Sequence, residues 1–132
     1  MAGTIWTAAQ TFSAEGGKES VITLKMPHRG VIRGYRLAQT NGLLRGATSS
    51  LYTSNQETSP NREQPAEQFR VLSVELPVGA AKVENHFARV SYANRDGTEE
   101  APQRLMYLKI TPYGVGPKSF TFSATVETLP LV

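Results

Sequence analysis

The chain of 132 residues contains no cysteine. It can therefore form neither disulfides nor thiolate metal sites, and we expect it to fold in a reducing compartment. Its first residues, MAGTIWTAAQTF, alternate in polarity and lack the basic and apolar regions of a signal peptide. No apolar run approaches the roughly 20 residues that a membrane-spanning helix needs. These absences predict a protein that is neither exported by the standard route nor inserted in a membrane.

Residues that carry most enzyme chemistry are scarce in this sequence. The histidines are His28 and His86, and Asp96 is the single aspartate. Neither histidine has a second ligand at the spacing of a zinc site. No serine lies in a G-x-S-x-G elbow, and the turn NRDG by itself explains Asp96. We therefore expect no catalytic residue, no metal, no cofactor and no enzymatic activity.

The segment YGVGPKSF, residues 113–120, has the composition of a phosphate-binding loop without its spacing. Gly114 and Gly116 are two residues apart, and Pro117 separates them from Lys118. A P-loop needs four residues between its glycines and a helix after its lysine, whereas a strand-like pattern follows here. We interpret the glycines as turn residues. The stretch 107–127 is accordingly predicted to be a β-hairpin.

Three segments have more than one interpretation. Asp96, Glu99 and Glu100 lie in DGTEE, which is either a calcium-binding loop or a solvated turn. Trp6, the single tryptophan, is either a stacking platform for a sugar or, as we favour, a core or subunit contact. The polar stretch 54–67 is long enough to be either functional or mobile.

The dominant hydrophobic period is two, which is typical of strands. In SFTFSATVET, Phe120 and Phe122 alternate with serine and threonine, and no window of 12 residues carries a helical apolar stripe. Residues 80–83 are expected to form at most one helical turn. Strand patterns cover residues 4–12, 20–26, 30–39, 49–54, 67–76, 86–93, 104–112 and 119–128.

Turn signals such as TNG, PVG and NRDG separate these segments. About eight short strands in a chain of this length predict an all-β protein, a single domain over residues 1–132. We expect an antiparallel two-sheet β-sandwich, with a jelly roll as the first topology. The residues expected in its core are Leu24, Leu72, Leu108, Phe120 and Phe122.

The net charge of +3 is unevenly distributed, because no acidic residue lies between Glu19 and Glu57. Simple alternation along this stretch places Arg29 and Arg33 on one face of a strand and Arg36 on the other. Arg29 and Arg33 are then available for acidic groups of a partner, and Arg36 for an acid of its own chain. Alternatively, all three are solvated. The basic residues are too dispersed to predict direct nucleic-acid binding.

Several segments of this short, cysteine-free, all-β chain carry a resemblance: HRGVIRGYRLAQTNG, SLYTSN, YANRDG and YLKITPYGVGPKSFTFSATVE. Together with the terminal strand, they resemble small head proteins of tailed phages, the decoration or cement proteins. The last segment is also similar to the final hairpin of secreted protease-associated β-sandwich domains.

The phage resemblance implies a structural virion protein that binds the major capsid protein at the outer surface of the head. It implies a homotrimer that joins neighbouring capsid subunits, is assembled in the host cytoplasm and resides in the virion. Trp6, Arg29 and Arg33 are then the expected partner contacts. The alternative is a non-catalytic β-sandwich binding module for a glycan or a protein, which would carry an aromatic surface groove.

Overall fold

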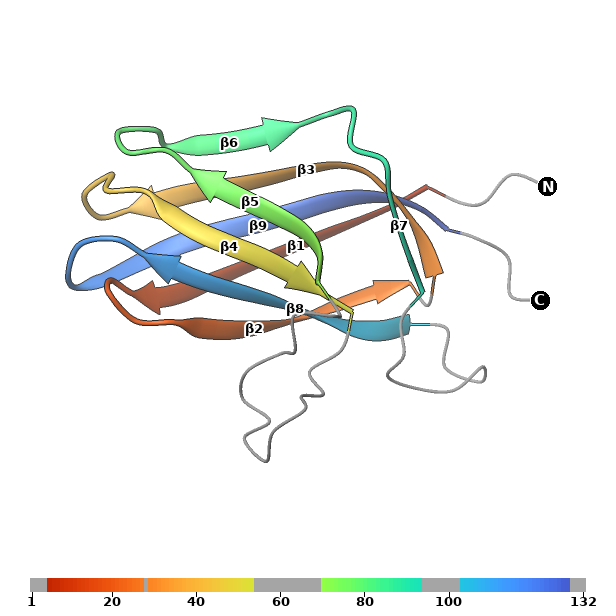
Figure 1. Cartoon of the computed structure of the whole chain (residues 1–132), viewed down its shortest axis with the longest axis horizontal. Helices are drawn as coiled ribbons and strands as arrows, with labels where there is room; N and C mark the ends of the chain where they lie inside the picture. Colours follow the sequence, from red (N-terminus) through yellow and green to blue (C-terminus); the bar gives the residue numbers. More distant parts are fainter. Residues whose placement is uncertain (1–4, 28, 54–69, 94–102, 129–132) are drawn as a thin grey trace.

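The computed structural model describes residues 5–27, 29–53, 70–93 and 103–128 (Figure 1). All regular elements in these ranges are strands, which confirms the all-β class. There are nine, one more than the sequence suggested. They are β1 (Ile5–Glu15), β2 (Ser20–Pro27), β3 (Arg29–Asn41), β4 (Ala47–Tyr52), β5 (Arg70–Leu76), β6 (Lys82–Asn85), β7 (Val90–Ala93), β8 (Gln103–Pro112) and β9 (Pro117–Thr128).

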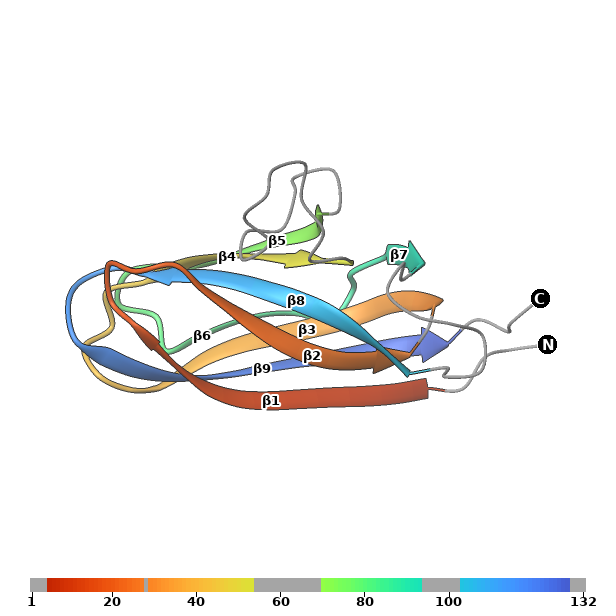
Figure 2. The ribbon, with the colours of Figure 1, turned by 90° about the horizontal axis from the view of Figure 1, so that it is seen from below.

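The strands form two antiparallel sheets that face each other, so the predicted sandwich is confirmed (Figure 2). One sheet has the order β1-β9-β3-β6, with β7 also paired to β3, and the other has the order β2-β8-β4-β5. The pairs β1–β9, β2–β8, β3 with β6 and β7, and β4–β5 are nested along the chain. Such nesting arises when a long antiparallel hairpin of paired strands folds over so that its strands form two sheets. This is the jelly-roll topology.

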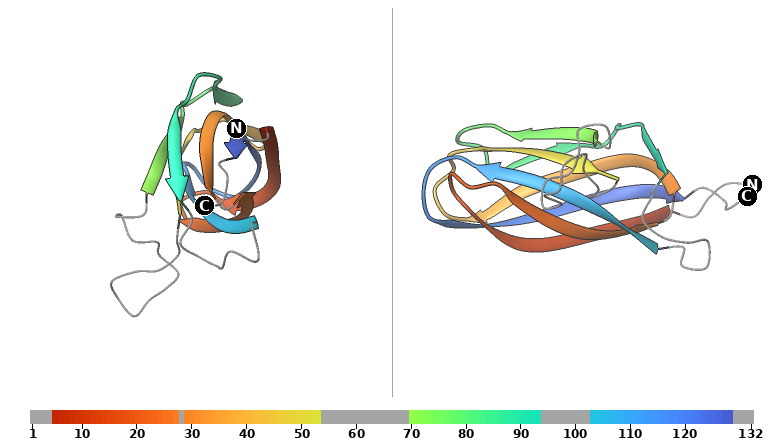
Figure 3. Two further views of the ribbon diagram at one scale, coloured as in Figure 1. Left: turned by 90° about the vertical axis from the view of Figure 1, so that its right-hand side faces the viewer. Right: turned by 60° about the horizontal axis from the view of Figure 1, so that its bottom comes forward.

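Four loops of the jelly roll cross between the sheets at the same end of the sandwich, the left-hand end of Figure 1 (Figure 3). They connect β1 to β2, β3 to β4, β5 to β6 and β8 to β9. We call this end the crossing end. The described ends of the chain, at residues 5 and 128, lie at the opposite end (Figure 1).

The predicted hairpin over residues 107–127 is wrong. β8 and β9 are consecutive strands but belong to different sheets, because β8 pairs with β2 and β4 while β9 pairs with β1 and β3. A strand did follow the loop as expected, and Gly114 and Gly116 have φ of 89° and 84°. Alternation reports which face of a strand is buried but not which strand it pairs with, so it could not distinguish a hairpin from a crossing.

The core lies between the sheets and matches the sequence prediction closely. Leu24, Leu108, Phe120 and Phe122 are at most 3% exposed, and Leu72 is partly buried and packs against them. Phe12 lies opposite Phe120 in the register of β1 and β9, and their rings stack with centroids 5.7 Å apart. These side chains join the edge strand β1 to the centre of the core.

β3 departs from simple alternation through a bulge. Its register with β9 shifts between Ile32 and Gly34, so Arg33 is an extra residue on β3. Before the bulge the even-numbered residues point toward the core, and after it the odd-numbered residues do. Ile32 and Leu37, which have opposite parity, are consequently both fully buried. Arg36 therefore shares the outer face with Arg33, and its expected placement on the opposite face is wrong.

The ninth strand, β6, occupies a stretch for which the sequence suggested at most a helical turn. Its Val83 lies opposite Leu37 of β3 and packs against the core. The segment KVEN offers a single apolar residue, so its pattern was too short to identify from sequence. The extended conformation of β6 is therefore set by its pairing with β3 and not by the local sequence pattern.

Backbone hydrogen bonds join the loops of the crossing end. Gly16 donates to the carbonyl of Gly116 (2.8 Å), Tyr113 to that of Gly46 (2.9 Å) and Gly79 to that of Leu44 (2.8 Å). The four loops are thus connected in a row, from the β1–β2 turn through β8–β9 and β3–β4 to β5–β6. We infer that this end is a rigid platform rather than a set of independent loops.

Truncating the central ring of the core tests the packing. Phe122→Ala should lower the free energy of unfolding by about 3–5 kcal/mol, because it empties a site that is fully enclosed. Ser123→Ala, one residue along on the outer face, should change it by less than about 0.5 kcal/mol. Urea denaturation of the two variants measures both values, and equal effects would contradict the assignment of faces.

Two glycines of the crossing end provide a matched pair for testing its close packing. Gly46 and Gly79 have almost the same φ, 84° and 83°, but a Cβ on Gly46 would lie 2.7 Å from the carbonyl oxygen of Leu76, whereas nothing lies within 4 Å of one on Gly79. Gly79→Ala should destabilise by about 1–2 kcal/mol from backbone conformation alone. Gly46→Ala should lower the free energy of unfolding by more than Gly79→Ala, as measured by urea denaturation. Equal losses of stability would show that the loops move apart at little cost.

Candidate functional site

The sequence-predicted contact Arg33 is engaged within its own chain. Its Nη2 and Nε lie 2.6 and 3.0 Å from Oε1 of Glu127 on the neighbouring strand β9. The side chains of Arg33 and Glu127 are 38% and 27% exposed, so the pair is half-buried on the outer face of its sheet. A partner carboxylate would have to compete with Glu127 for this guanidinium.

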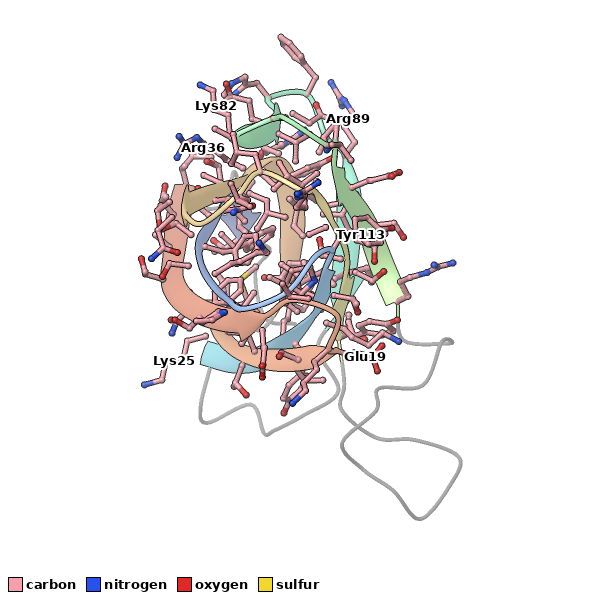
Figure 4. The ribbon with its side chains drawn as sticks, turned by 90° about the vertical axis from the view of Figure 1, so that its left-hand side faces the viewer. Glu19, Lys25, Arg36, Lys82, Arg89 and Tyr113 are labelled. Carbon is pink, nitrogen blue, oxygen red and sulfur yellow. The ribbon has the colours of Figure 1, made fainter. Side chains whose placement is uncertain are left out.

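A second charged cluster surrounds Glu84 of β6. Lys82 Nζ lies 3.2 Å and His86 Nε2 3.3 Å from its carboxylate, and Arg36 Nε lies 3.9 Å away. The expected pairing of Arg36 with an acid of its own chain is therefore confirmed. Figure 4 shows Arg36 and Lys82 together at one side of the molecule. The hydrogen bond from Lys82 lowers the pKa of Glu84 most; desolvation opposes it, and the charges of Lys82, His86 and Arg36 lower the pKa further.

Arg29 differs from the other two arginines of β3. It is partly buried at the start of the strand, and no acidic partner contacts it in the described part of the chain. Trp6 lies opposite Val126 in β1–β9, and Val126 lies opposite Ile32 in β9–β3. The backbone positions of Trp6 and Arg33 thus lie near each other, one strand apart in the same sheet, while the side chain of Trp6 lies outside the described residues.

Several sequence candidates cannot be placed in the fold. His28, Asp96, Glu99, Glu100 and the stretch 54–67 lie outside the described residues. Within the described ranges, no three histidine, aspartate or glutamate side chains gather as a metal site would require. None of the described residues forms a helix long and apolar enough to cross a membrane.

The crossing end carries an apolar surface that sequence reasoning missed. Of the six large hydrophobic residues described as exposed, four lie here on three loops. They are Leu43 (68% exposed), Val78 (74%), Tyr113 (44%) and Val115 (88%), and we call them the loop-end patch. Figure 4 views the molecule from this end, with Tyr113 on its surface. Contiguous exposed apolar side chains on a rigid surface are typical of interaction sites.

The patch surrounds a cleft of about 420 Å³ that is also lined by Arg45 and Lys118. Lys118 is only 2% exposed, and its Nζ donates to the carbonyl oxygen of Leu43 at 3.2 Å. A Cβ built on Gly114 would lie 3.0 Å from Cγ of Arg45 and 3.7 Å from Nζ of Lys118, so both basic side chains pack around this glycine. The cleft therefore combines an apolar rim with two cations.

The position of Lys118 explains its burial. Its side chain lies on the face of β9 that points toward the core, two residues before Phe120, at the point where the core meets the crossing end. Beside it, the buried side chain of Gln39 donates to the carbonyls of Asn41 (2.9 Å) and Leu43 (2.8 Å), while its Oε1 has no partner in the described structure. The alternation of SFTFSATVET, extended backward by one step, would have indicated an inward lysine.

Comparison with known proteins yields one informative likeness. No protein-family model matches this chain, and no curated protein matches its sequence. Its fold is similar to that of a chain in a solved structure described as the capsid asymmetric unit of cyanophage Pam1, with a TM-score of 0.53 and 11% identity. The likeness covers 97% of this chain and 87% of that chain. The protein thus shares its fold with a phage capsid chain, in agreement with the resemblance inferred from the sequence.

The charge cluster predicts a specific titration. The folded-state pKa of Glu84 is lowered, so the stabilisation is present above the unfolded-state pKa and is lost as the pH falls through the folded value. Carboxyl chemical shifts followed by NMR should place the pKa of Glu84 below its ordinary value. Lys82→Gln should raise it most and Arg36→Gln less, since that side chain is farther away. Lys25→Gln is the control, and an unchanged pKa in Lys82→Gln would contradict the assigned cause.

Proposed function

We propose that this chain is a structural virion protein that binds the outer surface of a phage head as a decoration, or cement, protein. The observation that carries the proposal is the whole-length fold likeness to a chain of a phage capsid asymmetric unit. The sequence resemblance to small phage head proteins supports it independently. In this role the protein needs no catalytic group, only surfaces that adhere at several points.

The loop-end patch is the surface we assign to the capsid. Apolar side chains that are 68–88% exposed in the isolated chain gain most from burial at an interface, at roughly 25 cal/mol for each Å² removed from water. The hydrogen bonds between the loops connect their backbones, so little backbone conformational entropy is lost on binding. A rigid apolar end therefore suits permanent attachment to a protein surface.

A homotrimer is the oligomeric state we propose, by resemblance to decoration proteins. Three copies of one modest contact bind a symmetric surface far more tightly than one copy, because the second and third contacts form at high effective concentration. Light-scattering mass measurement on the purified chain tests this proposal, and a monomer at micromolar concentration would contradict it.

Arg29, Arg33 and Trp6 stay a prediction as partner contacts at the other end of the sheet. Arg29 leads this set, because no acid contacts it within the described residues, whereas Glu127 already binds Arg33. Glu127 holds the guanidinium of Arg33 in place and compensates its charge, so Arg29 is the cation available to an acidic partner. A sister subunit or capsid protein with acidic side chains would match this part of the outer face of β3.

A glycan-binding module is the less favoured function. Sugar sites use neighbouring aromatic platforms, and the two aromatic side chains described as exposed lie on different loops, Phe87 between β6 and β7 and Tyr113 between β8 and β9. A protein-binding module shares the apolar end with the decoration protein. Binding to heads distinguishes these functions.

Attachment to heads can be measured by co-sedimentation. Heads of the phage that encodes this chain, prepared without it, are mixed with purified protein and pelleted over a range of concentrations. We expect saturable binding by the parent and a loss of at least about tenfold in affinity for Leu43→Ser combined with Val115→Ser, since two anchor side chains are removed.

Phe87→Ser provides the matched control for that experiment. Phe87 is 90% exposed in the β6–β7 connection and does not line the cleft of the loop-end patch, so its replacement removes exposed apolar surface elsewhere on the molecule. It should bind heads like the parent. If the parent chain does not pellet with heads, the proposed function fails. If Phe87→Ser weakens binding more than the double variant does, the patch is not the attachment surface.

A further inference from the structure

We propose that the cleft at the crossing end binds the carboxylate of a glutamate or aspartate side chain that a partner protein presents from an apolar surface segment. This inference rests on the proposed attachment of the loop-end patch and names the group that the patch receives. Its core observation is an apolar rim around two cations, Arg45 and Lys118, inside one cleft of about 420 Å³.

Neither cation is neutralised by the chain itself within the described residues. No acidic side chain there contacts Arg45 or Lys118, and the one described acceptor of the Lys118 ammonium is the carbonyl of Leu43. An ammonium has three N–H donors, so two remain without a partner in the described structure. Burying a charge without a counter-charge is unfavourable, and an incoming carboxylate would relieve this cost.

The two acids of the adjoining β1–β2 turn already have partners. In the adjoining β1–β2 turn, Glu15 binds Lys18 at 3.3 Å, and Glu19 at the end of that turn binds Lys109 at 3.5 Å. The hydrogen bonds from Gly16 to Gly116 and from Gly17 to Pro112 fix this turn against the β8–β9 loop. Among the described residues no acid pairs with Arg45 or Lys118, and we assign the counter-charge to a partner protein.

The shape of the site favours a protein segment over a free anion. Leu43, Val78, Tyr113 and Val115 line the same cleft as the cations, and they present apolar surface that a small anion would leave in water. A carboxylate side chain on an apolar protein segment matches both the apolar rim and the cations. The apolar residues next to it in the segment cover the rim, while its oxygens reach Arg45 and Lys118. Exclusion of water by the rim would strengthen the charge pair.

The test uses two blocked tripeptides and the full chain. Acetyl-Leu-Glu-Leu-amide and acetyl-Leu-Gln-Leu-amide differ in one charge, and acetate and inorganic phosphate serve as free anions. Backbone amide shifts are followed by ¹H–¹⁵N NMR during each titration. We expect the glutamate peptide to shift the amides of residues 42–46 and 113–116, and to bind roughly tenfold or more tightly than the glutamine peptide.

Variants separate the two cations from general charge effects. Arg45→Gln removes an exposed cation, and Lys118→Met removes the buried one with little change in volume; each should reduce the preference for glutamate to about threefold or less. Lys25→Gln, on the exposed face of β2, has the same charge change and should leave the preference intact. If Lys118→Met does not fold, Arg45→Gln alone decides.

Two outcomes would overturn the proposal. One is equal binding of the two peptides, or shifts confined to other regions. The other is that acetate or phosphate produces the same shifts at the same concentrations as the glutamate peptide, which would make the cleft a general anion site. Because these titrations use the isolated protein, they succeed or fail independently of the co-sedimentation with heads.

Discussion

The crossing of four strand connections between the two sheets at one end is the constraint on which the molecule depends. Each crossing loop must pass close to its neighbour, and the backbones meet: a Cβ on Gly16 would lie 2.8 Å from the carbonyl oxygen of Gly114. Glycine permits this approach, and the resulting hydrogen bonds connect all four loops. The end that closes the core thereby presents its four loops as one connected surface.

That surface reconciles two requirements that usually conflict. Apolar side chains on flexible loops promote nonspecific association, whereas the same side chains on connected loops present one fixed shape. Lys118 has a double role here. Its aliphatic stem continues the inward face of β9, and its ammonium lies at the floor of the cleft beside Arg45. The inner face of one strand thus ends in a charge that faces a possible partner.

The outer face of the β3 sheet is organised differently. There several cations are compensated within the chain: Glu127 binds Arg33, and Glu84 is shared by Lys82, His86 and Arg36, whereas no described acid contacts Arg29. A compensated charge contributes orientation and selectivity more than affinity, because a partner must replace an existing pair. This contrast is the reason for assigning attachment to the crossing end and a secondary role to the outer face of β3.

The sequence by itself determined the fold class and most of the core. Alternation over β2, β8 and β9 was sufficient to predict the burial of Leu24, Leu108, Phe120 and Phe122, because burial of one face of a strand produces a local sequence pattern with a period of two. Strand pairing, in contrast, depends on residues far apart in the chain. The tertiary structure therefore decided that β8 and β9 are in different sheets, that a bulge at Arg33 moves Arg36 to the outer face, and that β6 exists. It also decided the site, since Leu43, Val78 and Val115 lie in separate turns of the sequence and become neighbours only when the loops cross together.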